Sequence, residues 1–258
     1  MSDLFDLTGC TALVSGASGR LGPSMVRTLV EAGARVVAVA RDRSRLEEAL
    51  DGVPADLRTC DITSADWPDL VASVAAEYDR IDVLVNNAHV GRGGSLRLAQ
   101  PEDFTEAFGL AVTATADGIN AARDGLRISA ESGGPASVVN IASMYGLVAP
   151  DPRVYESEEA RNPPAYGAAK AAMLQLTRYA AAELAPEGIR VNSITLGPFP
   201  GAATPGTETL LERIAARTML GRLGQPGEVA TALLYLASPA SSYVTGSNVT
   251  VDGGWTAW

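Results

Sequence analysis

Three residues of this chain have the types and the spacing that proton transfer to an alcohol or a carbonyl requires. Tyr166 and Lys170 are four residues apart in the segment YGAAK, so on a helix they share one face. The ordinary pKa of a tyrosine is about 10, and the positive charge of a nearby lysine favours the tyrosinate. Tyr166 can then act as a general acid and base near neutral pH. Ser143, at the end of a predicted strand, can donate a hydrogen bond to the substrate oxygen.

A glycine-rich segment follows the first predicted strand and opens a helix. It reads Ser15-Gly16-Ala17-Ser18-Gly19-Arg20-Leu21-Gly22. Glycines allow a sharp turn, and they let backbone N–H groups and the positive end of the helix dipole approach a pyrophosphate. A glycine-rich turn alone is weak evidence, but its place at the first strand-to-helix turn predicts a dinucleotide site.

The end of the second predicted strand bears on the choice between NADP and NAD. The strand ends at Ala40, and Arg41 and Asp42 follow. A carboxylate at this point typically binds the ribose 2′-hydroxyl of NAD, whereas an arginine suits the 2′-phosphate of NADP. Arg41 therefore favours NADP, with Arg20 and Arg43 as candidate helpers. Asp42 lies one place late for the ribose and keeps NAD as the alternative.

Short apolar runs alternate with longer helical patterns along the chain. The predicted strands are Thr11–Ser15, Arg35–Ala40, Asp56–Cys60, Asp82–Asn86, Ala136–Ala142, Ile189–Ile194 and Asn248–Val251. The predicted helices are Leu21–Ala32, Ser44–Leu50, Ser64–Tyr78, Pro101–Ser129, Ala165–Leu184, Thr207–Thr218 and Pro226–Ala237. This alternation is typical of βαβ units. We expect an α/β fold: one Rossmann domain over residues 1–258, with a doubly wound, seven-stranded parallel sheet and helices on both faces.

Two segments do not fit the alternation. Leu147–Pro164 is rich in prolines and acidic residues, and Leu196–Gly206 is rich in Pro, Gly and Ala. Irregular loops inside a compact α/β domain are more often functional than decorative. Because Leu147–Pro164 joins Ser143 to Tyr166, we expect it to be a lid over the substrate; a solvated surface insertion is the alternative. Its polar residues, as candidate substrate contacts, are Arg153, Tyr155, Glu156 and Asn162.

From Leu7 to Gly254, the combined motifs resemble those of the short-chain dehydrogenase/reductase family. The matching segments are the turn Gly16–Gly22, Asp61 after the third strand, Asn86-Asn87-Ala88-His89, Ser143, the YxxxK of Tyr166 and Lys170, Leu196-Gly197-Pro198, Thr245-Gly246 and Val251-Asp252-Gly253-Gly254. The resemblance implies catalytic roles for Ser143, Tyr166 and Lys170, with Lys170 also binding the nicotinamide ribose. The cofactor-binding residues that it implies are Gly16, Ser18, Gly19, Arg20, Leu21, Gly22, Arg41, Asp61, Ile62, Asn87, Ala88, Tyr166, Lys170 and Gly197.

The chain departs from the family pattern at five places. Ser15 stands in the position of a threonine and Leu196 in that of a proline. Gly19 comes early and Arg20 fills the usual glycine position, a spacing that is common among the family's extended members. His89 replaces the glycine of the family's NNAG. Ala111 falls at the position of the family's fourth catalytic residue, an asparagine that helps to hold a relay water. We expect His89 to contact cofactor or substrate rather than to transfer protons.

Composition excludes several other classes of protein. The formal net charge is −10 and the basic residues are scattered, which argues against binding to nucleic acid or to an anionic membrane. Two cysteines, Cys10 and Cys60, and one histidine exclude a disulfide scaffold and a Cys/His zinc cage. No metal site is predicted, and the acidic Glu156, Glu158 and Glu159 are interpreted as a solvated loop. The polar N-terminal segment does not resemble a signal peptide, so we expect a cytoplasmic protein.

The resulting expectation is an NADP-dependent enzyme that interconverts a secondary alcohol and a carbonyl. A sugar or polyol derivative is the preferred small-molecule substrate. One alternative is a cofactor-retaining epimerase or dehydratase, and another is a non-catalytic NAD(P)-sensing module, which Ala111 mildly favours. The family resemblance also implies a homo-oligomer, a tetramer or a dimer.

Overall fold

The apolar runs of the sequence form the seven strands of one parallel sheet. The computed structural model describes residues 2–89, 91–201 and 207–258. The strands are β1 (Thr11–Ser15), β2 (Arg35–Ala40), β3 (Asp56–Thr59), β4 (Val83–Asn86), β5 (Ser137–Ser143), β6 (Arg190–Leu196) and β7 (Asn248–Val251). Their order in the sheet is β3-β2-β1-β4-β5-β6-β7.

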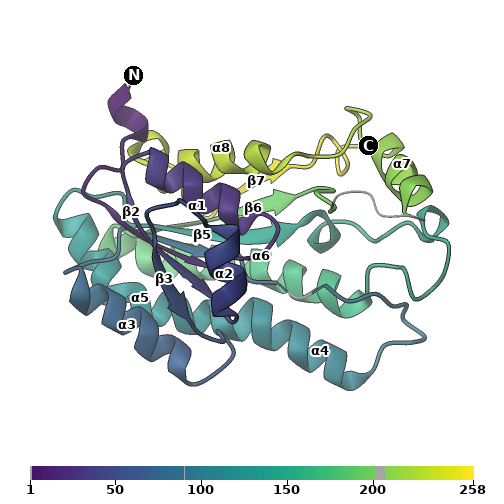
Figure 1. The fold of residues 1–258 in the computed structure, drawn as a ribbon, viewed down its shortest axis with the longest axis horizontal. Coiled ribbons are helices and arrows are strands. Elements are labelled where there is room, and N and C mark those ends of the chain that lie inside the picture. The colour runs from purple at the N-terminus through teal and green to yellow at the C-terminus, as the bar shows by residue number, and fades with distance from the viewer. Residues whose placement is uncertain (1, 90, 202–206) are drawn as a thin grey trace.

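Helices connect successive strands and cover both faces of this sheet (Figure 1). They are α1 (Gly22–Glu31), α2 (Arg43–Ala49), α3 (Asp66–Glu77), α4 (Pro101–Phe108), α5 (Ala114–Glu131), α6 (Pro164–Leu184), α7 (Glu208–Ala216) and α8 (Pro226–Ala237). Side chains of α1, α2 and α8 share one apolar core with the sheet. Side chains of α3, α5 and α6 share the core of the opposite face. The expected single, doubly wound Rossmann domain is confirmed.

Burial on two faces explains the continuous apolar character of the central strands. Every residue of β1, β4, β5 and β6 is buried, whereas the edge strands β3 and β7 are only partly so. A strand covered by helices on both sides gains free energy from apolar side chains on both faces, so polar–apolar alternation disappears. These runs were therefore strong sequence signals, and the predicted strand ends lie within two residues of the observed ones.

The strand order places a crevice beside the carboxyl end of β1. The chain passes from β1 outward to β2 and β3, and then returns to the other side of β1 as β4. Loops that leave β1 and β4 consequently diverge onto opposite faces, and open α/β sheets bind ligands at this point. The glycine-rich turn follows β1, Asn87 follows β4, and Ser143 ends β5 at the same edge of the sheet.

The prediction of one helix over Pro101–Ser129 is wrong in its middle. A π-helical turn at Gly109–Thr113 separates α4 from α5, and Ala111 is buried within it. A π-helical turn inserts one extra residue into a helix and is frequently found at functional sites. Its hydrogen-bond pattern leaves little trace in apolar periodicity, so the sequence did not indicate it.

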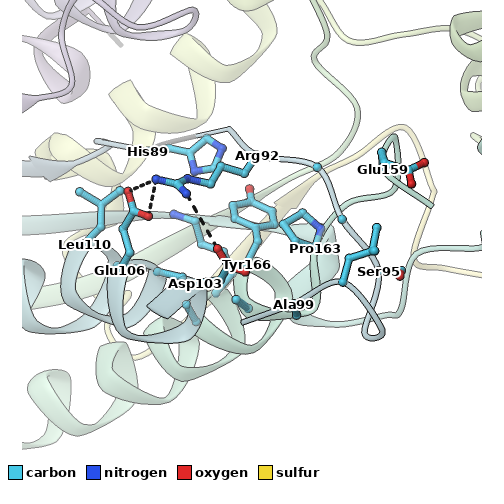
Figure 2. Close-up of a pocket in the computed structure, with 18 of the residues that line it drawn as sticks. His89, Arg92, Ser95, Ala99, Asp103, Glu106, Leu110, Glu159, Pro163 and Tyr166 are labelled. Atoms are coloured by element: carbon cyan, nitrogen blue, oxygen red, sulfur yellow. Dashed lines mark hydrogen bonds and ion pairs between the residues drawn. The ribbon is translucent and has the colours of Figure 1, made fainter. Parts of the chain in front are cut away.

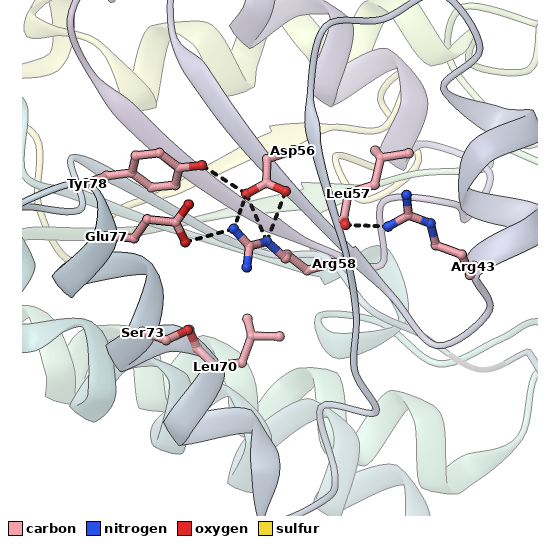
Figure 3. A network of polar contacts seen from close by, with 8 residues as sticks. All are labelled: Arg43, Asp56, Leu57, Arg58, Leu70, Ser73, Glu77 and Tyr78. Atoms are coloured by element: carbon pink, nitrogen blue, oxygen red, sulfur yellow. Dashed lines mark hydrogen bonds and ion pairs between the residues drawn. The ribbon is translucent and has the colours of Figure 1, made fainter.

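A polar network anchors the edge strand β3 to its neighbouring helices (Figure 3). Arg58 binds Asp56 at 2.6 Å and Glu77 of α3 at 2.8 Å, and the Tyr78 hydroxyl donates to Asp56 at 3.0 Å. Charged side chains on an edge strand also disfavour pairing with another chain. The network attaches the edge strand β3 to the C-terminal end of α3.

Candidate active site

The three residues expected to carry the chemistry lie together at the carboxyl edge of the sheet. Ser143 ends β5, while Tyr166 and Lys170 occupy the first two turns of α6. All three line one cleft of about 750 Å³. The Lys170 ammonium group is buried and donates a hydrogen bond of 2.6 Å to the carbonyl oxygen of Ile141 in β5.

Burial is the main cause of the pKa shifts of Tyr166 and Lys170. It raises the pKa of Tyr166, and a hydrogen bond with Ser143 opposes that effect. Burial also lowers the pKa of Lys170 to about 8. This rise in the pKa of Tyr166 is opposite to the fall that we expected from the positive charge of Lys170. The protein by itself therefore holds Tyr166 as a neutral phenol, and Lys170 is the group whose charge can change near neutral pH.

The cleft runs from these residues to the glycine-rich turn and the end of β2. The expected cofactor-binding residues that line it are Gly16, Ser18, Gly19, Arg20, Leu21, Arg41, Ile62, Asn87, Ala88, Tyr166, Lys170 and Gly197. Gly22 and Asp61 are not among its lining residues. The structure thus brings together twelve of the fourteen expected residues from segments that are far apart in the sequence.

Close backbone packing explains the glycines at the two ends of the turn. Gly16 has φ 65°, and a Cβ there would lie 2.6 Å from the Cα of Ala88. A Cβ on Gly22 would lie 2.5 Å from the carbonyl oxygens of Gly16 and Ala17. Such contacts are forbidden for any side chain, so only glycine allows the turn to fold onto itself and onto the β4 loop. Gly22 consequently shapes the cradle without lining it.

Asn87 fixes the opposite wall of this cradle. Its side-chain amide donates to the carbonyl oxygens of Ser15 and Gly16 at 3.2 and 3.0 Å. Its backbone N–H donates to the Ser15 hydroxyl at 3.1 Å. These bonds tie the loop after β4 to the turn after β1, and the enclosed space fits a dinucleotide whose pyrophosphate lies on the turn.

At the end of the cleft next to β2, where we expect the adenosine, the side chains of Arg41 and Asp42 differ in the hydrogen bonds and ion pairs that they make. The carboxylate of Asp42 accepts hydrogen bonds from the Ser44 hydroxyl at 2.8 Å and the Arg45 backbone N–H at 3.1 Å, which cap α2 and lower its pKa. Arg41 is 65% exposed, and its nearest ionic partner is Asp61 at 4.0 Å.

The two candidate helpers of Arg41 are held elsewhere. Arg43 donates to the carbonyl oxygen of Leu57 at 2.6 Å and to Glu47 at 2.7 Å. Arg20 donates to the carbonyl oxygen of Phe199 at 2.5 Å, across the cleft from the turn. Arg20 still lines the cleft, as does Arg45, which we did not single out from the sequence.

A second, smaller chamber of about 140 Å³ adjoins the cleft beside Tyr166 (Figure 2). Its walls come from α4, α6, the loop after β4, and the end of the insertion. His89, Tyr166 and Lys170 line both the chamber and the cleft. Arg92 spans the outer side, where it pairs with Glu106 at 2.6 Å and approaches Asp103 to 3.8 Å. The sequence had not indicated this chamber, because no motif joins α4 to the loop after β4.

The insertion Leu147–Pro164 is attached on both sides of the site. Asp151 binds Arg217, just after α7, at 2.7 Å. On the other side, Glu158 accepts a hydrogen bond of 2.8 Å from Ser95 in the loop after β4. The insertion therefore bridges two loops that flank the cleft.

The four polar residues of the insertion that we expected to contact the substrate line neither the cleft nor the chamber. Tyr155 instead shares a hydrogen bond of 2.6 Å with the hydroxyl of Tyr145, two residues after Ser143. Arg153 pairs with Asp151. Among the described residues, the insertion contributes only Glu159 and Pro163 to the chamber and none to the cleft.

Neither a membrane-spanning helix nor a metal-binding cluster is found in residues 2–89, 91–201 and 207–258. No helix in these ranges is long and apolar enough to span a membrane. No group of three or more His, Cys, Asp or Glu side chains in these ranges is arranged to hold a metal ion.

Comparison with known proteins agrees with this geometry. The family model described as "Enoyl-(Acyl carrier protein) reductase" matches residues 16–256. The rhamnolipids biosynthesis 3-oxoacyl-[acyl-carrier-protein] reductase of Pseudomonas aeruginosa is 35% identical, with 99% of each chain covered. A galactitol 2-dehydrogenase (L-tagatose-forming) of Cereibacter sphaeroides is 33% identical, with 99% of this chain and 98% of the relative covered.

A solved structure also matches over the whole chain. The Pseudomonas aeruginosa RhlG/NADP active-site complex superposes with a TM-score of 0.87 at 33% identity, covering 99% of this chain and all of the other. Fold, site geometry and sequence likeness agree. The chain belongs to the short-chain dehydrogenase/reductase family of NAD(P)-dependent oxidoreductases, which interconvert alcohols and carbonyls.

Proposed function

We propose that this protein is an NADP-dependent dehydrogenase that acts on a small, neutral, polyhydroxylated substrate such as a sugar or polyol derivative. One observation carries the proposal. A single cleft connects a glycine cradle and the exposed Arg41 at one end with Ser143, Tyr166 and Lys170 at the other. Bound NADP would supply or accept the hydride. The protein must then position the substrate and move one proton.

Each of the three residues has a role that follows from its surroundings. Ser143 orients the substrate oxygen by a hydrogen bond and also contacts the Tyr166 hydroxyl. Tyr166 donates its phenolic proton to a carbonyl, or accepts one from an alcohol. Lys170 donates one hydrogen bond to Ile141 and a weak one of 3.8 Å to the sulfur of Met173. Its remaining N–H donor is available for the ribose hydroxyls of the cofactor. Its positive charge favours the tyrosinate that oxidation requires.

The preference for NADP is supported by the adenosine end of the cleft. Asp42 is engaged in capping α2, whereas Arg41 is exposed beside the cleft. A guanidinium group binds a phosphate through two charge-assisted hydrogen bonds. A ligand with a 2′-phosphate thus has an exposed guanidinium donor available, whereas one oxygen of the Asp42 carboxylate is already used to cap α2.

Titration of NADP and NAD tests this preference. Arg41→Ala should weaken NADP binding roughly tenfold to a hundredfold, the range of a hydrogen bond between charged groups, and change NAD binding little. Arg43→Ala is the matched control, because it removes the same charge from a side chain bound to Leu57 and Glu47. Wild-type binding of NAD as tight as that of NADP would refute the preference, as would equal losses in the two variants.

The substrate class is supported by the charges of the chamber. Asp103, Glu106 and Glu159 contribute carboxylates to its lining, and Arg92 already pairs with the first two. A neutral hydroxylated substrate meets no repulsion there, while an anionic one would. The galactitol 2-dehydrogenase relative agrees with this class. Absorbance of reduced nicotinamide should change with polyols and ketoses; product formed without net change would instead show an epimerase, and binding without product a sensor.

We also propose a closed homo-oligomer. Phe108 of α4, Ile128 of α5 and Tyr179 of α6 are exposed apolar side chains on the helices of one face. Such helices can supply a symmetric contact between copies. A monomeric mass by light scattering at micromolar concentration would contradict this.

A further inference from the structure

His89 stands where the cleft and the chamber meet. It is the only histidine of the chain, and it follows β4 by three residues. Its ring is exposed to the two cavities and lies against Tyr166, with ring centroids 4.7 Å apart and planes tilted by 52°. Figure 2 shows the imidazole beside the hydroxyl end of the Tyr166 ring. A group bound to the Tyr166 hydroxyl is therefore close to His89.

The imidazole of His89 has hydrogen-bonding capacity that the protein does not use. Although the side chain is exposed to the two cavities, desolvation by the protein packed around it and the charge of Lys170 lower the pKa of His89 to about 4, so the ring is neutral at neutral pH. A neutral imidazole has one N–H donor and one acceptor nitrogen. No described residue makes a hydrogen bond to either nitrogen. Arg92 in the same loop does not compete for the acceptor, because Glu106 and Asp103 hold its guanidinium group.

The chamber provides room for a substrate that extends past the reacting carbon. The side chains that line its inner part include Ala99, Ala107, Ala111 and Ala169. A larger residue at position 111 would fill part of this volume. A substrate carbon chain that starts at Tyr166 and continues into the chamber would run beside His89, since the two rings are in contact and both line both cavities.

On the basis of the proposed function, we infer that His89 is a substrate-binding residue that determines specificity. Its imidazole forms a hydrogen bond with a hydroxyl group on the carbon next to the reacting one, and the rest of the substrate occupies the chamber. The enzyme should therefore prefer vicinal diols and α-hydroxyketones to simple secondary alcohols and ketones. Proton transfer stays with Tyr166.

Two substitutions separate hydrogen bonding from packing. His89→Phe keeps an aromatic ring against Tyr166 and removes both nitrogens. His89→Gln removes the ring and keeps one donor and one acceptor. The measured quantity is kcat/KM with NADP for a matched pair of substrates, butane-2,3-diol and butan-2-ol. The ratio of the two values reports recognition of the second hydroxyl group.

The wild type should favour the diol. His89→Phe should lower that preference roughly tenfold, the worth of one neutral hydrogen bond to a substrate hydroxyl. His89→Gln should keep most of the preference. NADP affinity and circular dichroism check that each variant is folded; if His89→Phe is not, His89→Leu replaces it.

Three results would overturn the inference: a wild type without preference for the diol, a His89→Phe variant that keeps the full preference, or equal losses in His89→Phe and His89→Gln. The test is distinct from that of the proposed function. Absence of NADP reduction with every alcohol would refute the dehydrogenase, whereas turnover of both alcohols without discrimination would refute only the role of His89.

Discussion

Replacing Lys170 with methionine should stabilise the folded protein while removing most of its activity. The Lys170 side chain is 3% exposed, and burial lowers its pKa from 10.5 to about 8. At roughly 1.4 kcal/mol per pH unit, keeping this lysine charged in the folded state costs about 3 kcal/mol near pH 7. Methionine has a similar length and no charge, so it avoids this cost.

The loss of a hydrogen bond offsets part of the gain. Without the Lys170 ammonium group, the carbonyl oxygen of Ile141 loses its 2.6 Å partner. An unsatisfied buried acceptor costs about 1–3 kcal/mol. The net stabilisation of Lys170→Met at pH 7 is then about 1 kcal/mol, which corresponds to roughly 2 °C in Tm for a chain of this size.

The pH dependence gives a larger and cleaner signal. Below pH 8 both the folded and the unfolded state hold the Lys170 proton, and the full cost is present. Between pH 8 and 10.5 the folded state releases the proton while the unfolded state keeps it, so wild-type stability rises with pH relative to the variant. From pH 7 to 9.5 the rise should be about 2 kcal/mol, enough for the wild type to become the more stable protein.

The assay is urea unfolding of both proteins without cofactor, at matched protein concentration, across this pH range. Lys170 is the only lysine of the chain. Selective labelling of lysine therefore gives one side-chain NMR signal, whose titration should have a midpoint near pH 8. A stability difference that does not change with pH, or a midpoint near 10.5, would refute the assigned cost of burial.

Two further substitutions test the site. Tyr166→Phe should lower kcat by at least about a hundredfold, because it removes the acid and base, while NADP affinity should stay within about threefold; most of the wild-type kcat in this variant would contradict the assigned role. Replacing residues 149–161 with a Gly-Ser turn should raise KM or broaden the substrate range, because the insertion bridges the loops on both sides of the cleft. Unchanged KM and substrate range in a folded variant would leave the insertion a surface feature.

The sheet could be predicted from the sequence because its main determinant is local. Strands such as β5, buried along all seven residues, must be apolar on both faces, and this requirement is visible in any window of the chain. The turn Gly16–Gly22 was visible for a related reason, since only glycine tolerates its backbone contacts. Both signals come from the kinds of side chain that a position cannot hold. Neither requires knowing which distant residue lies beside that position.

The hydrogen-bond partners of the charged side chains could not be predicted, because several groups that are close in space compete for each of them. Arg43 was a candidate phosphate ligand, yet the carbonyl oxygen of Leu57 holds it on the edge strand. Asp42 was the alternative ribose partner, yet it caps α2. The pKa of Tyr166 was expected to fall, but the desolvation of its phenol outweighs the neighbouring hydrogen bond from Ser143. The first two outcomes depend on which groups the fold brings together, and the pKa of Tyr166 depends on its burial.

The arginines of this chain have structural roles, whereas its single lysine has a chemical one. Lys and Arg together number 20, and only Lys170 is a lysine. Arginines form the surface ion pairs, such as Arg58 with Asp56 and Arg123 with Glu183, and they stay protonated at every working pH. An arginine at position 170 would therefore keep its charge however deeply it was buried. A lysine there has a pKa that burial lowers to about 8, so its charge can change close to neutral pH.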